Sequence, residues 1–184
     1  METRARCPAA SVLPARPRHR TLRPPCTVES IFRNFTIRRA ALIRALTTDE
    51  EALFNKCDPG MQLLCLRGNT DGSWEVKLPE SCVPISQPEP TLSINISRDK
   101  MKRHEWLQEV AVQCDAWLIN ISFYFAPLLI ASERERLFNM INSLKTVQET
   151  FLASNTYLRI CHLEEEVTCF CSELYTNQVV YIQV

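Results

Sequence analysis

An apolar run from Ala116 to Ile130 constrains the fold of this 184-residue chain more than any other feature. Twelve of its fifteen positions are apolar. A membrane-spanning helix needs about 20 apolar residues, whereas this run is shorter and is interrupted by Asn120, Ser122 and Pro127. We therefore expect no membrane span. The run instead predicts a long helix from about Met101 to Phe125, apolar nearly all round, at the centre of a hydrophobic core.

Three other segments place apolar residues at helical spacing. The first runs from Thr27, which can cap a helix, to Leu46. The second follows the capping-box pattern Thr48-Asp49-Glu50-Glu51 and is ended by Asp58-Pro59-Gly60. The third follows Ser132-Glu133-Arg134-Glu135, another capping-box pattern. Together with the long helix, these segments predict four main helices.

A short antiparallel sheet is expected between residues 62 and 96. The apolar run at residues 63–66 is followed by the turn-rich residues 68–72 and then by Trp74, Val76 and Leu78, which alternate with charged residues. Leu92, Ile94 and Ile96 alternate again and suggest a third strand. The sequence therefore predicts an α+β fold, a mainly helical domain with a small antiparallel sheet.

The two ends of the chain differ from this central segment. Residues 1–26 contain six Arg, five Pro and one acidic residue, so we expect a disordered arm; an organelle transit peptide and a nucleic-acid-binding arm are the alternatives. Residues 153–184 differ in character, with three consecutive glutamates at 164–166 and a strand-like run at 179–184, and are expected to form a disordered tail. The predicted organisation is thus an arm (1–26), a domain (27–152) and a divergent tail (153–184).

The sequence gives no positive sign of catalysis or of a cofactor. The three glycines do not frame a phosphate-binding loop. His104 and Cys114 lie ten residues apart on one predicted helix, about 15 Å along its axis, so they cannot form a thiol–imidazole pair. Cys161, His162, Cys169 and Cys171 lack the paired spacing of a structural zinc site. We expect neither an enzyme nor a metal-binding protein.

Four residues are candidates for a partner interface. Trp74 and Trp106 are of the type enriched at protein interfaces, although packing in the core is the alternative for each. Arg38 and Arg39 belong to a series of arginines on the first helix, which predicts either a solvated face or a surface for an acidic partner.

Several blocks of the sequence resemble one known family, the plant Alfin-like proteins, in the family's own order. These blocks cover about 125 of the 184 residues and are TVESIFRNFTIRRAALIRALTTDEEALFNKCDP (27–59), LCLRGNTDGSWEVKLP (64–79), PEPTLSINISRDKM (88–101), WLQEVAVQCDAWLINISFYF (106–125) and ERLFNMINSL (135–144).

The resemblance implies a nuclear chromatin regulator. In the family, a C-terminal PHD finger binds zinc and reads methylated histone tails, and the N-terminal domain is a protein-interaction module, associated with self-association and with Polycomb-type partners. The residues after Phe151 lack the finger's Cys/His spacing, so no zinc ligand and no histone-contacting residue carries over. We expect a transcriptional regulator that acts by binding partners, or else a truncated product that is inactive or competes with full-length relatives.

Overall fold

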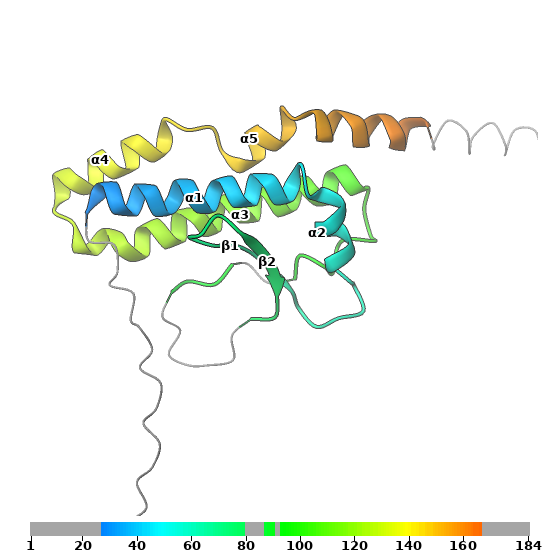
Figure 1. Cartoon of the computed structure of the whole chain (residues 1–184), viewed down its shortest axis with the longest axis horizontal. Coiled ribbons are helices and arrows are strands. Elements are labelled where there is room, and N and C mark those ends of the chain that lie inside the picture. Colours follow the sequence, from blue (N-terminus) through cyan, green and yellow to red (C-terminus); the bar gives the residue numbers. More distant parts are fainter. Residues whose placement is uncertain (1–26, 80–86, 91–92, 167–184) are drawn as a thin grey trace, which may run out of the picture.

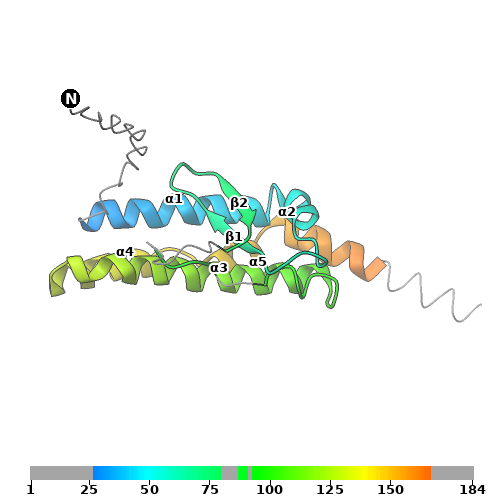
Figure 2. The ribbon, with the colours of Figure 1, turned by 90° about the horizontal axis from the view of Figure 1, so that it is seen from below.

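Two long helices that lie side by side carry the fold (Figures 1 and 2). They are α1 (Val28–Leu46) and α3 (Arg103–Phe125). After α3, a short 3₁₀ turn, η1 (Ala126–Leu128), reverses the chain, and α4 (Ala131–Asn142) and α5 (Val147–Leu152) return along the pair. This computed structural model describes residues 27–79, 87–90 and 93–166. The mainly helical fold expected from the sequence is confirmed.

Helix α1 begins where the sequence predicts. The Thr27 hydroxyl accepts a hydrogen bond from the Ser30 backbone N–H at 3.2 Å, and the Ser30 hydroxyl accepts one from the Thr27 N–H at 3.1 Å. These bonds satisfy backbone donors that an uncapped helix would leave without partners. One face of the helix then packs into the core with residues that include Ile31, Phe35 and Leu42.

Helix α3 is the central core helix, as its apolar sequence predicts. Its buried residues occur along the whole length and include Trp106, Trp117 and Phe125. The Asp115 carboxylate of α3 accepts hydrogen bonds from the backbone N–H groups of Val147 and Gln148 at 2.7 and 3.0 Å, which fixes the start of α5. Among the described residues, none of the helices is long and apolar enough to cross a membrane.

The predicted hairpin is formed by β1 (Cys65–Gly68) and β2 (Trp74–Lys77), which pair antiparallel with Leu66 opposite Val76. It packs directly on α1. Gly68 permits the approach, because a Cβ atom there would lie 2.6 Å from the carbonyl oxygen of Arg38. The hairpin and α1 are therefore held at backbone contact distance.

The prediction of a third strand at residues 92–96 is wrong for residues 93–96, the part that the structure describes. Residues 94–96 form a turn, and Ser93 has a φ of 77°. The completely buried Asn95 accepts a hydrogen bond from the Leu64 N–H at 3.0 Å and donates to the Asp58 carbonyl at 2.9 Å. These bonds hold the segment as a turn against the chain before β1, so the described sheet contains only β1 and β2.

Helix α2 (Glu50–Lys56) starts at a different cap from the one predicted. Asp49, not Thr48, precedes its first residue, and the Asp49 side chain forms no hydrogen bond to the helix backbone. Its carboxylate accepts a hydrogen bond from the indole of Trp74 at 2.7 Å and another from Arg44 at 3.2 Å. The Asp49 carboxylate therefore makes tertiary contacts instead of capping the helix, and the capping box predicted at Thr48 is wrong.

The disorder expected after residue 152 does not extend to the first part of the tail. Residues 155–166 are helical, and Ile160 is buried with a 4% exposed fraction (Figure 1, orange). The ion pair of Arg159 with Glu50 at 3.0 Å and a hydrogen bond from Thr156 to the Thr47 carbonyl at 3.2 Å hold this helix on the rest of the domain. The arm of residues 1–26 and the tail beyond residue 166 lie outside the described residues.

Candidate interaction site

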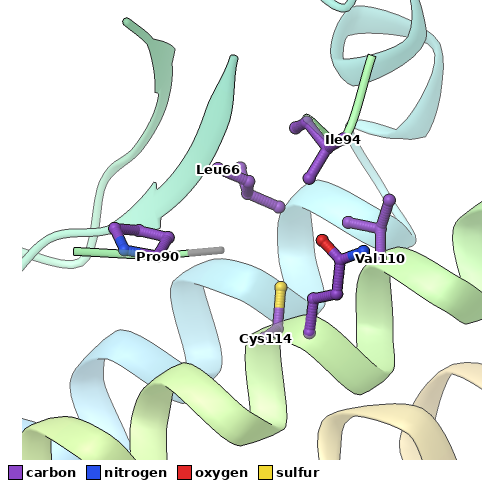
Figure 3. Close-up of a pocket in the computed structure, with 6 residues that line it drawn as sticks. Leu66, Pro90, Ile94, Val110 and Cys114 are labelled. Atoms are coloured by element: carbon purple, nitrogen blue, oxygen red, sulfur yellow. The ribbon is translucent and has the colours of Figure 1, made fainter. Parts of the chain in front are cut away.

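The enclosed cavity at the hairpin is too small for a ligand. Its volume is about 10 Å³, and it is lined by Leu66, Pro90, Ile94, Val110, Gln113 and Cys114 (Figure 3). A cavity needs about 10–15 Å³ to hold one water molecule. Burial raises the pKa of the Cys114 thiol, so this thiol stays protonated and is a poor nucleophile.

Among the described residues, the other candidate reactive groups do not come together in one site either. His104 contacts Glu164 rather than a thiol. Burial raises the pKa of Cys57 to about 12. In the part of the chain that the structure describes, no group of three His, Cys, Asp or Glu residues could hold a metal ion. Cys169 and Cys171 lie outside the described residues, so the expected absence of zinc stays a prediction.

The two candidate tryptophans have different environments. Trp106 has an exposed fraction of 0%, donates its indole N–H to the Ile94 carbonyl at 2.6 Å and meets the ring of Phe54 edge-on. Trp106 is therefore a core residue, which agrees with the packing alternative and not with a partner interface. Trp74 is half-buried, and the Lys56 ammonium lies 4.6 Å from its ring centroid. Its indole N–H is bound to Asp49, so Trp74 mainly joins the hairpin to α2.

Arg38 is buried, so it lies neither on a solvated face nor on a surface open to an acidic partner, the two alternatives expected from the sequence. Its exposed fraction is 6%, and its guanidinium donates to the Gly68 carbonyl at 2.6 Å and to the Asn34 amide oxygen at 2.7 Å. The same group lies 5.5 Å from the Trp117 ring centroid. Burial, and to a smaller degree the charge of Arg67, lowers the pKa of Arg38. Arg38 therefore ties the hairpin to α1 and α3.

Arg39 also makes internal contacts. It donates to the Lys145 carbonyl and to the Thr150 hydroxyl, both at 2.9 Å, and so joins α1 to α5 and to the segment before α5. Partial burial lowers the pKa of Arg39, while the charge of Asp115 acts in the opposite direction. Neither arginine presents a free guanidinium to an acidic partner.

The best-developed candidate surface is an apolar patch at the end of the helix pair, which the sequence analysis assigned to the core. We define this end patch as Phe123, Pro127, Leu128, Ile130 and Phe138, from the end of α3, the η1 turn and α4. Phe123, Leu128 and Ile130 are 58%, 57% and 66% exposed. The rings of Phe123 and Phe138 lie 4.7 Å apart between centroids.

An open pocket of about 410 Å³ lies within the end patch, lined by Phe123, Ala126, Pro127, Arg134 and Phe138. Exposed apolar side chains that cluster in this way mark protein-interaction sites. A second open pocket, of about 420 Å³, is lined by Met61, Gln62, Leu63, Pro79 and Ile96. It adjoins residues 80–86, which are outside the described part, so the end patch is the better-defined surface.

The chain is similar in sequence to proteins of one family. The Alfin family model matches residues 27–153. The chain is 52% identical over 128 residues to PHD finger protein ALFIN-LIKE 3 of Oryza sativa subsp. japonica, which is 70% of this chain and 52% of that protein. It is 49% identical over 125 residues to PHD finger protein ALFIN-LIKE 1 of Arabidopsis thaliana, covering 68% and 52% of the two chains. The chain thus spans about half the length of the curated relatives it matches.

Proposed function

This chain belongs to the Alfin family, and from that premise we propose that it is a protein-interaction domain of a nuclear, chromatin-associated transcriptional regulator. The relatives are named as PHD finger proteins, and the part they share with this chain is residues 27–153. The proposed partners are other Alfin-like chains and chromatin proteins, including Polycomb-type complexes.

The observation that carries this proposal is the end patch. Phe123, Pro127 and Phe138 of the patch line an open pocket, and Leu128 and Ile130 are exposed beside them in the sequence. Removing such apolar surface from water is favourable by about 25 cal/mol per Å², and the part that exceeds the cost of association appears as affinity. Aromatic residues at the centre of an apolar patch commonly dominate the binding energy of an interface. We therefore assign partner binding to the end of α3 and the start of α4.

Binding rather than catalysis fits the chemistry of the domain. The buried thiols of Cys57 and Cys114 have raised pKa values, and the enclosed cavity holds one water molecule at most. Recognition of a methylated lysine needs an open aromatic cage, whereas Phe123 and Phe138 pack against each other. We propose that histone reading belongs to the PHD finger of full-length relatives, and that this domain shows no preference for methylated histone peptides.

A matched pair of substitutions on α3 tests the proposal. Phe123→Asp places a charge in the end patch, and Val112→Asp places the same charge on an exposed apolar position of the same helix, 46% exposed. The assay is co-purification with a full-length ALFIN-LIKE 3 protein, followed by titration. We expect Phe123→Asp to weaken binding at least tenfold and Val112→Asp to leave it unchanged. Equal effects of the two substitutions, or no binding by the native chain, would overturn the proposal.

A second candidate function is competition with full-length relatives for their partners. It is favoured by the match itself, because the shared segment is the folded domain and covers about half of each relative. Adding this chain to a complex of a full-length relative and its partner should then release the relative. Continued retention of the relative at saturating chain concentration would instead favour a product without independent activity.

A further inference from the structure

The helix of residues 155–166 lies in a groove built by other parts of the chain. We define the groove as the surface formed by Glu50 and Glu51 of α2 and by Lys102 and Arg103 at the N-terminal end of α3, which line an open pocket together with residues of this helix. The family match ends at residue 153, so the groove belongs to the Alfin domain and the helix that fills it does not. The groove lies at the opposite end of α3 from the end patch, so its role goes beyond the proposed function.

Charged groups make the main polar contacts between the helix and the groove. The Glu164 carboxylate accepts a hydrogen bond from the Arg103 backbone N–H at 2.6 Å and pairs with the His104 ring. Arg103 is the first residue of the 23-residue helix α3, whose N-terminal end favours a negative charge. Lys102 precedes α3 and its side chain makes no capping hydrogen bond. Glu164 therefore supplies the acceptor for the backbone N–H of Arg103.

A buried carboxylate in the groove requires a cation. Glu50 is 2% exposed and is paired with Arg103 of α3 and, at 3.0 Å, with Arg159 of the docked helix. A carboxylate this deeply buried is costly unless it is paired. Arg159 thus adds a second cation to a carboxylate that Arg103 already pairs within the domain, and each side of the contact supplies one charge to the other.

The apolar part of the contact is small. Ile160 is the buried apolar residue of the helix, Tyr157 packs edge-on against Phe151, and Leu158 and Leu163 are 55% and 51% exposed. A hollow of about 400 Å³ remains between the helix and the walls formed by Glu50, Glu51, Lys102 and Arg103. The groove is therefore larger than the helix that occupies it.

We propose that this groove is a docking site for an amphipathic helix of a partner protein that carries one cation and one carboxylate, and that residues 155–166 occupy it in cis as a competing helix. The docked helix shows what the groove recognises. Its pattern consists of an aromatic residue at Tyr157, a cation at Arg159, an aliphatic residue at Ile160 and a carboxylate at Glu164. A partner helix with this pattern gains the same contacts and can fill the hollow with a larger side chain.

The test uses the full chain and a fluorescent peptide of residues 153–166 as the probe. In the native chain the groove is occupied, so the apparent affinity for the peptide is reduced by the fraction of chains that are open. Ile160→Asp should release the helix, and the peptide should then bind at least tenfold more tightly than to the native chain. The matched control is Glu165→Gln, since Glu165 is exposed beside Glu164; this chain should bind the peptide as the native chain does.

Changes in the peptide keep the test independent of chain folding. A peptide with Glu164→Gln or Ile160→Asp should bind the released chain at least tenfold more weakly. Hydrogen exchange of residues 155–166 reports release directly, and the double variant Ile160→Asp/Glu164→Gln should exchange faster there than the native chain.

Three results would overturn the proposal. The first is unchanged exchange in the double variant. The second is a released chain that binds none of the peptides, or binds all of them equally. The third is a native dimer that the variant loses, which would place the helix in the groove of a second copy.

Discussion

Substitution of Gly68 by Ala tests how closely the hairpin approaches α1. The new methyl group would lie 2.6 Å from the Arg38 carbonyl oxygen and 3.1 Å from Leu42 Cγ, whereas ordinary contact begins at 3.4 Å. Because the nearest atom is helix backbone, no rotation of a side chain can relieve the clash. The hairpin must move from α1 by about 0.8 Å at this point, the difference between these two contact distances.

The cost has two sources. Overpacking of a tight contact typically costs about 1–3 kcal/mol. The same movement strains the 2.6 Å hydrogen bond from Arg38 to the Gly68 carbonyl, and a bond to a charged donor contributes about 1.5–3 kcal/mol. If part of that bond is lost, Gly68→Ala should lower the free energy of unfolding by about 2–4 kcal/mol, a large share of the ~5–15 kcal/mol of a typical domain.

Urea unfolding of the Gly68→Ala and Gly60→Ala chains provides the assay. At Gly60 the nearest atom to a new Cβ is a side-chain oxygen of Asp58 at 3.3 Å, which can move. Both substitutions reduce the entropy of the unfolded chain by the same amount, so their difference reports the clash. We expect Gly60→Ala to change stability by less than about 0.5 kcal/mol. The reasoning fails if the two variants differ by less than about 1 kcal/mol.

Three further predictions concern the core, the thiols and metal content. Trp117 is 2% exposed and donates to the Pro88 carbonyl at 3.0 Å, so Trp117→Ala should cost about 3–5 kcal/mol in chemical denaturation; a loss below about 1 kcal/mol would contradict this burial. Burial raises the pKa of Cys57 from 9.0 to about 12, so its protonated thiol favours the folded state below pH 9 and this contribution is lost as the pH rises towards 12. The stability difference between native and Cys57→Ala chains should therefore narrow between pH 7 and pH 10, and a constant difference would argue against the shift. Purified chain should contain no stoichiometric zinc by elemental analysis, and one zinc per chain would refute the sequence argument.

The elements that depend on local signals could be predicted from the sequence. Thr27 and Ser30 cap α1 through neighbours three residues apart, and the apolar run of α3 requires burial wherever it lies. The hairpin follows from alternation and a turn. The turn at Asn95 could not be predicted, because the pattern around Ile94 is that of a strand and the deciding bonds reach residues 31 and 37 positions away.

The interaction surfaces were harder to predict because exposure depends on what packs beside each residue. Arg38 belongs to a series of charged residues typical of a solvated helix face, but the hairpin covers it. Phe123 lies in a run of apolar residues typical of a core, but it is 58% exposed, whereas Ser122 and Phe125 on the same turn of α3 are buried. The helix of residues 155–166 is held through pairs such as Arg159 with Glu50, 109 residues apart, and no local pattern records such a contact.

The two ends of the described chain lie far apart. Helix α1 begins at one end of the helix pair, and the helix of residues 155–166 ends at the other (Figures 1 and 2). The separation is at least about the length of the 23-residue helix α3, roughly 34 Å at 1.5 Å per residue. A flexible linker would need about 40 residues to span this distance on average. Modules joined to the two ends therefore contact separate sites on a large assembly more readily than they contact each other.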